Sequence, residues 1–269
     1  MTSPEELIRA RFGGLPFAPP AELPPALAAL LDRRVTRRYR PDPVPEPLLS
    51  AVLAAAQSAP SKSDLQQYAI IVLQQREKIA AIAGWIGTMP WIADAPVFLL
   101  FCADMRRGRR ICALHGREFA NDSMDGFLNA VVDATAAMAF CIAAADAAGL
   151  GSCPISYVRN HLEKVAPLAG LPKGVFPVAG LTLGWPEARN PTSPRLPPAV
   201  VVHRERYDDS GLEAALAAYD ALRPPAAPRY PDLFGQARER WSANAARQLA
   251  VPERAGLRTW LRWHGFGLE

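Results

Sequence analysis

One stretch of this sequence constrains the fold more than any other, a continuous apolar helix pattern from about residue 123 to residue 148. Its apolar residues fall on nearly every side of the predicted helix: Val131, Val132, Ala134, Met138, Phe140, Cys141 and Ile142. Such a helix lies either at the centre of a large core or in an interface. Asn129, Asp133 and Asp146 make it a poor membrane span, so no membrane partner is expected.

The length and composition suit a core of that size. A chain of 269 residues fits one domain with a long tail or two small domains. Half of the residues are hydrophobic and 21% are charged, which is typical of a soluble protein. The net charge of +4 is spread along the chain, and the basic cluster at residues 106–110 has no aromatic residues interleaved. The balance therefore indicates small anionic ligands rather than nucleic acid.

The four cysteines predict neither a disulfide framework nor a zinc site. They form no CxxC pair and have no histidine at metal-ligand spacing: Cys102, Cys112, Cys141 and Cys153. Cys102 and Cys141 lie in apolar runs, which is typical of buried thiols in a reducing compartment. The first residues carry acids and arginine where an export signal needs an apolar core. We therefore expect a cytoplasmic protein without a bound metal.

The remaining patterns predict alternating helices and strands. Strands are expected at residues 69–73, 97–102, 175–184 and 199–203, and a loop at 85–91. Helices are expected at residues 4–11, 26–33, 159–168, 212–222 and 238–249, with another starting at Pro47. Strands separated by helices in this way indicate an α+β sandwich.

A dense arginine cluster precedes the helix that starts at Pro47. Arg33-Arg34-Val35-Thr36-Arg37-Arg38-Tyr39 has four arginines in seven residues. These charges repel one another unless an anion neutralises them, and the planar guanidinium group matches phosphate oxygens two at a time. A solvated charge run is the alternative for this heptamer taken alone.

No pattern in the sequence predicts side-chain catalysis. There is no GxGxxG after a strand, no Walker loop, and none of the four histidines stands in a signature. Gly149-Leu150-Gly151 follows a helix and is consistent with a helix cap. The residues indicate anion binding instead, as in an enzyme whose cofactor carries the chemistry.

Four motifs together resemble the FMN-dependent nitroreductase family, in particular its larger NADPH-linked nitroreductase and flavin reductase branch. They are the arginine cluster, the turn Pro60-Ser61-Lys62-Ser63-Asp64-Leu65-Gln66, Gly149-Leu150-Gly151 and Pro194-Arg195-Leu196-Pro197. The resemblance covers about residues 33–219 and, more loosely, the arginine-rich tail. It implies an α+β fold in which helices flank a mixed sheet, with a long central interface helix and a C-terminal extension. The expected division is an N-terminal helical segment (1–32), an FMN-binding domain (33–222) and a C-terminal loop, helix and tail (223–269).

The resemblance also implies a set of FMN contacts. Arg33 and Arg34 resemble residues on the phosphate side, and Arg195 resembles the arginine that holds the phosphate from the other side. Arg37 resembles the residue that faces the ring edge where negative charge appears on reduction. The other implied contacts are Val35, Ser61, Ser63, Met89, Trp91, Pro154, Ile155, Ser156, Tyr157 and Ser193.

Several of these positions depart from the family pattern. Val35 replaces a common serine, Met89 replaces a frequent glutamine, and Ser193 replaces a lysine. Ser156-Tyr157 replaces small glycines at the turn that covers the ring, and Lys62 is unusual within the serine run. The phosphate cations remain, so the departures bear on the choice of substrate.

The leading hypothesis is an FMN-dependent NAD(P)H oxidoreductase that reduces nitroaromatics, quinones or free flavin in two-electron ping-pong steps. A homodimer is implied, and Arg223, Arg229 and Arg238 are candidates for holding the NADPH 2′-phosphate, with solvation of a loop as their alternative role. The open alternatives are reductive chemistry of another kind, such as that of a dehalogenase-like flavoprotein, and a non-catalytic flavin-binding regulator. Weak nucleic-acid binding by the two arginine clusters is a further one.

Overall fold

The computed structural model describes residues 2–269, which form two compact units. Unit 1 contains the residues up to Arg33 together with Pro191–Glu253, and unit 2 contains Arg34–Asn190 and Arg254–Glu269. The chain therefore leaves unit 2, builds most of unit 1 and returns to unit 2 with its last segment. The expected division at residues 33 and 223 stays a prediction, because these units group the chain by spatial contact.

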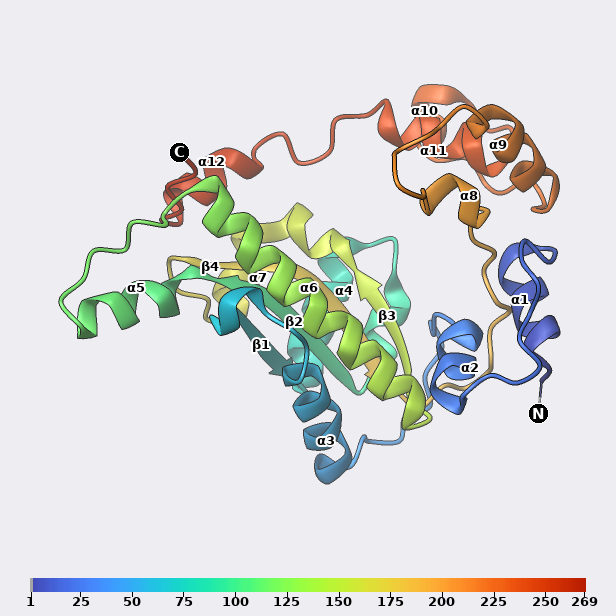
Figure 1. The fold of residues 1–269 in the computed structure, drawn as a ribbon. Coiled ribbons are helices and arrows are strands. Elements are labelled where there is room, and N and C mark those ends of the chain that lie inside the picture. The colour runs from blue at the N-terminus through green and yellow to red at the C-terminus, as the bar shows by residue number, and fades with distance from the viewer. Residues whose placement is uncertain (1) are drawn as a thin grey trace. The chain divides into compact units, whose positions relative to one another are not determined.

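A four-stranded sheet organises unit 2 (Figure 1). Its spatial order is β1 (Tyr68–Leu73), β2 (Val97–Asp104), β4 (Val175–Gly184) and β3 (Gly151–Ile155). The three strand pairings are antiparallel, and a parallel bridge joins Val35 to Ser152 beside β3. The strands expected at 69–73, 97–102 and 175–184 are confirmed. Strand β3 was not expected, because its five residues contain both Gly151 and Pro154, which weaken a strand pattern.

The long apolar helix lies over one face of this sheet (Figure 1). It is α6 (Met124–Ala147), which starts where the Ser123 hydroxyl caps the Gly126 N–H at 3.2 Å. A row of small residues lets it approach the sheet and α3 (Glu46–Gln57) closely: Ala130, Ala134, Ala137, Cys141 and Ala145. By length and composition α6 could cross a membrane, a test that the core helix of a soluble protein also meets.

The opposite face of the sheet is covered by shorter elements. They are α4 (Arg76–Ile86), η2 (Pro90–Asp94), η3 (Ser156–His161) and α7 (Leu162–Leu168). Strand β2 supplies both layers, since Leu99 and Phe101 face α6 whereas Phe98 and Leu100 face this second layer. The loop expected at 85–91 is wrong at both ends. Trp85 lies in α4, whose buried isoleucines pack on the sheet, and Pro90 and Trp91 lie in η2.

The last segment of the chain completes the core of unit 2. After β2 the second arginine cluster forms α5 (Met105–Leu114), and α12 (Leu257–Trp263) packs on the sheet nearby. The ring of Trp260 is 4% exposed and meets Phe176 edge to face, with ring centres 5.9 Å apart. Trp263 is 73% exposed, so only one of the two tail tryptophans enters the core.

Unit 1 is built from helices: α1 (Pro4–Phe12), α2 (Pro25–Asp32), α8 (Pro198–Val201), α9 (Leu212–Ala221), α10 (Pro231–Phe234) and α11 (Trp241–Leu249). The expected capping box at the first helix is confirmed, since Ser3 and Glu6 bond reciprocally. The strand expected at 199–203 is wrong. Pro198 occupies a first helical position, where its fixed φ and missing N–H suit a helix start, and it begins α8 instead.

Candidate functional site

The arginine segment is fastened by its backbone along the end of the sheet. The Thr36 N–H donates to the Ser152 carbonyl at 2.9 Å, and the Arg40 N–H donates to the Trp185 carbonyl at 2.9 Å. A Cβ on Gly151 would lie 2.2 Å from the Thr36 Oγ1, so only glycine lets the two segments approach this closely. The Gly149-Leu150-Gly151 turn therefore serves this crossing as well as ending α6.

The buried side chain of Tyr39 fixes the same segment to the sheet. Its hydroxyl contacts the Thr36 carbonyl at 2.8 Å and the Thr182 hydroxyl at 2.7 Å. Burial raises the pKa of Tyr39 well above its usual range, so the group stays a neutral hydrogen-bonding phenol. Arg37 lies between the fixed residues Thr36 and Tyr39 with its side chain exposed. The segment thus presents a cation from a rigid backbone.

Four of the candidate ring contacts gather on one side of the sheet. Val35, Met89, Trp91 and Tyr157 all pack against the core cluster beneath α4 and η2. Pro154 and Ser156 are exposed next to them, whereas Ile155 is buried in the same cluster. The structure therefore brings the arginine segment, the Met89–Trp91 segment and the end of β3 to the same layer of unit 2.

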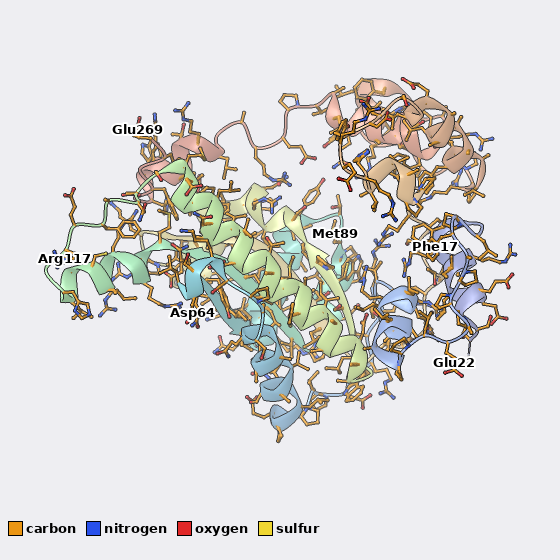
Figure 2. The ribbon with its side chains drawn as sticks, in the orientation of Figure 1. Phe17, Glu22, Asp64, Met89, Arg117 and Glu269 are labelled. Atoms are coloured by element: carbon orange, nitrogen blue, oxygen red, sulfur yellow. The ribbon has the colours of Figure 1, made fainter. Side chains whose placement is uncertain are left out.

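The serine turn lies on the other side of the sheet. It contains the short helix η1 (Lys62–Asp64), and it is bonded to Asp133 of α6, which covers the opposite face. In Figure 2 the labels Asp64 and Met89 mark these two places. A single copy of unit 2 therefore keeps Ser61 and Ser63 apart from Met89, Trp91 and Tyr157.

Sequence reasoning missed the role of Asp133. Its carboxylate accepts the backbone N–H groups of Lys62 and Gln67, both at 2.9 Å, and the residue is 1% exposed. The signal in the sequence was an acid in the middle of an apolar helix, but nothing in the sequence names its partner.

Within unit 1, Arg11 bonds to three further candidate residues. Its guanidinium donates to the Arg33 carbonyl at 2.7 Å and to the Ser193 carbonyl at 2.9 Å. The Arg195 N–H donates in turn to the Arg11 carbonyl at 2.7 Å. Arg11 is only 6% exposed, and sequence reasoning missed it because it reads as an ordinary charge near a helix end. Arg33, Ser193 and Arg195 are thereby fixed beside one another.

The Arg33 side chain fits a phosphate ligand. Its Nη1 is buried and donates to no acceptor among the described residues. Buried donors are nearly always paired, so a buried guanidinium nitrogen without an acceptor calls for an explanation. A phosphate oxygen is the acceptor that guanidinium geometry suits best. The donor set of unit 1 therefore fits the phosphate of FMN.

Two of the three candidate NADPH arginines have partners inside unit 1. The Arg223 Nη1 donates to the Tyr219 hydroxyl at 2.8 Å, and the Arg238 Nε donates to the Pro225 carbonyl at 3.0 Å. Arg229 is exposed, and its backbone N–H donates to the Asn244 side chain at 2.9 Å. A separate cavity of about 360 Å³ in the same unit is lined by residues that include His203, Arg204 and Arg206.

No cluster of metal-binding side chains is found among residues 2–269. The four cysteines are free thiols. The candidate site residues themselves supply guanidinium groups, hydroxyls, backbone groups and apolar side chains.

Comparison with known proteins identifies the family. A sequence model described as the nitroreductase family matches residues 30–185, and its C-terminal domain matches residues 193–269. The chain belongs to the nitroreductase family.

Named relatives and solved structures agree with this assignment. The chain is 39% identical over 197 residues to the FMN reductase [NAD(P)H] of Bacillus subtilis, covering 72% of this chain and 79% of that protein. It is 36% identical over 196 residues to the oxygen-insensitive NADPH nitroreductase of Salmonella typhimurium, covering 73% and 80% of the two chains. The solved structure of B. megaterium NfrA2 superposes with a TM-score of 0.84 at 32% identity, over 92% of this chain and 100% of that one. The expected fold class, an α+β fold with a sheet flanked by helices and a C-terminal extension, is confirmed. The strand pairings within the described sheet are all antiparallel, and the only parallel pairing among the described residues is the bridge between Val35 and Ser152 beside it.

Proposed function

We propose that this protein is an FMN-dependent oxidoreductase that takes electrons from NAD(P)H and passes them to nitroaromatic, quinone or flavin acceptors. The observation that carries the proposal is the family match over residues 30–185 and 193–269, with relatives named as FMN reductase and NADPH nitroreductase. The unpartnered Arg33 nitrogen supports it independently, because it supplies a donor for the cofactor phosphate.

The proposed roles of the residues follow from the chemistry of FMN. When bound, FMN accepts two electrons as a hydride and gives them to the second substrate, so the protein supplies binding and electrostatics. Arg33, Arg34 and Arg195 would hold the phosphate. Arg37, exposed on its fixed segment, would place a positive charge at the ring edge that becomes negative on reduction.

The remaining candidate residues would shape the site around the ring. Met89, Trp91 and Tyr157 offer a partly buried apolar wall, with Val35 next to the arginines. The exposed Pro154 and Ser156 flank the buried Ile155 at the end of β3. The Ser193 carbonyl accepts a hydrogen bond from Arg11, so Ser193 would help to fix the phosphate-binding arginines through its backbone.

We also propose that the protein is a homodimer with FMN at the seam. One copy of unit 2 holds the serine turn on the α6 face and the Met89–Trp91 wall on the other face. Both groups can meet one cofactor when the serine turn comes from a second copy. The outer side of α6 supports this, because it exposes large apolar side chains that an interface would cover: Leu128, Val132 and Phe140.

The donor preference and the location are the finer parts of the proposal. We propose NADPH as the preferred donor, with its 2′-phosphate near Arg229 and Arg238, the two exposed members of the set Arg223, Arg229 and Arg238. The arginines that line the cavity of about 360 Å³ form the comparison pair for any test of this placement. A cytoplasmic location is proposed from the four free thiols, which are typical of a reducing compartment.

The absorption spectrum of the purified protein tests the proposal. We expect a flavin spectrum that bleaches when NADPH is added without oxygen and returns when a nitroaromatic or a quinone is added. Bleaching that no acceptor reverses would contradict turnover with these acceptors. A bound flavin that NADPH does not bleach would instead support a non-catalytic regulator.

A further inference from the structure

The turn at residues 61–66 has an unusual backbone. Ser63, Asp64 and Gln66 have φ angles of 51°, 56° and 50°, a left-handed conformation that residues other than glycine adopt at a cost. Three such residues within four positions persist only when the surrounding structure holds them in place. The turn carries Ser61 and Ser63, two of the residues proposed to contact FMN.

Asp133 holds both ends of this turn from α6. Its Oδ1 accepts the Lys62 N–H at 2.9 Å, and its Oδ2 accepts the Gln67 N–H at 2.9 Å. The residue is 1% exposed, so neither bond competes with bulk water. One carboxylate thus holds the backbone at Lys62 and at Gln67, on either side of the strained residues.

A second contact fixes the turn from α5. The Arg107 Nη1 donates to the Gln66 carbonyl at 2.7 Å, and the Asp104 N–H donates to the Gln67 carbonyl at 2.9 Å. Asp104 also caps α5 at the Arg107 N–H, at 2.9 Å, which orients that arginine. The strained residues are therefore held by a buried anion on one side and a cation on the other.

We propose that Asp133 is a positioning residue for the cofactor, which acts by holding the turn 61–66 in the conformation that presents Ser61 and Ser63 to FMN. This inference rests on the proposed function for the flavin contact itself. Asp133 does not touch the cofactor. Its effect on FMN binding passes through the hydrogen bonds that it accepts from two backbone N–H groups of the turn.

The experiment measures the turn and the cofactor separately. Asp133→Ala removes both acceptors, and Asp133→Asn keeps one acceptor but turns an N–H₂ group toward the other donor. Asp125→Asn is the matched control, because Asp125 is an exposed acid on the same helix. Its carboxylate accepts a hydrogen bond from the Asn129 side chain. Hydrogen exchange of the full-length apoprotein follows the peptide containing residues 61–67, with β2 as the reference, and FMN affinity is measured by recovery of flavin fluorescence.

We expect exchange in the turn to accelerate by about tenfold or more in Asp133→Ala, since a hydrogen bond to a charged acceptor is lost at each end. Exchange in β2 should stay at the parent rate, and FMN affinity should fall by about tenfold. Asp133→Asn should show a smaller change in both, and Asp125→Asn should match the parent. Unchanged exchange in the turn, or unchanged FMN affinity despite faster exchange, overturns the proposal.

Arg107→Gln covers the case in which Asp133→Ala loosens the whole unit, seen as faster exchange in β2. Arg107 is partly exposed, so its replacement leaves the core intact, and it should speed exchange in the turn and weaken FMN by about twofold to fivefold. Parent values for both quantities in Arg107→Gln would then overturn the proposal. If the parent itself takes up no FMN, the proposed function fails and this inference falls with it, even where Asp133→Ala still speeds exchange in the turn.

Discussion

Replacing Arg33 by methionine should change cofactor affinity and apoprotein stability in opposite directions. The buried Nη1 of Arg33 donates to no acceptor among the described residues, while the Arg33 backbone is held by Arg11 through its carbonyl. Methionine keeps an unbranched apolar chain in place of the aliphatic part of arginine and removes the guanidinium group with its charge and its donors. The backbone bond to Arg11 is unaffected, so the change isolates the guanidinium group.

The magnitudes follow from the two states of that group. In the apoprotein an unsatisfied buried donor costs about 1–3 kcal/mol, so removing it should raise the free energy of unfolding or leave it unchanged. In the FMN complex the same group would make a charge-assisted bond to phosphate, worth about 1.5–3 kcal/mol. Its loss should weaken FMN by about tenfold to a hundredfold.

Titration of apoprotein with FMN and thermal unfolding without FMN measure the two effects. Arg195→Ala should also weaken FMN binding by about tenfold or more. Arg38→Ala is the control and should keep the parent affinity, because Arg38 is exposed and its Nε lies 3.7 Å from the Glu187 carboxylate. A melting temperature that rises by about 2–4 °C per kcal/mol gained would accompany the weaker binding. Equal FMN affinity in Arg33→Met and the parent would refute the phosphate assignment, and a clear drop in apoprotein stability would refute the orphaned-donor argument.

The other predictions concern assembly, donor choice and thiols. Leu128→Glu, on the exposed side of α6, should shift the sedimenting mass from dimer to monomer and release FMN; a parent that sediments as a monomer with FMN bound contradicts the seam. The double variant Arg229→Ala with Arg238→Ala should raise the KM for NADPH about tenfold or more and leave the KM for NADH unchanged. An equal effect of Arg204→Ala with Arg206→Ala would indicate instead that the 2′-phosphate binds in the cavity that those two residues line. Burial raises the pKa of Cys141 to about 12, so native protein at pH 8 should react with a thiol reagent at the partly exposed Cys112 and not at Cys141. Because the folded form binds the extra proton, this thiol should add stability below its unfolded pKa of about 8.5 and lose that contribution as the pH rises towards 12.

Local patterns predicted the elements of this fold well where one principle dominated. The helix at 124–147 and the strands at 97–104 and 175–184 are long and strongly apolar, so burial alone specifies them. The pattern failed at 199–203, where a proline start outweighed a run of β-branched residues, and at β3, which depends on neighbouring strands for its existence.

The candidate site was predictable only in part, because motifs specify residue types and not their partners. The cluster at 33–39 and Arg195 were visible as cations, and Ser61 and Ser63 as members of a turn. The residues that hold them in place, Arg11 and Asp133, act across 182 and 71 positions of sequence. No local pattern encodes bonds over such separations.

The return of the chain to unit 2 has a consequence for the order of folding. Trp260 and Phe266 close the aromatic cluster around Phe127 and Phe176. The chain therefore has to pass through unit 1 before the segment Arg254–Glu269 can cover this cluster. Until that segment docks, a sheet that has already formed leaves aromatic surface uncovered. Chaperones and proteases that bind exposed aromatic side chains would therefore distinguish a chain with the segment docked from one in which it is not.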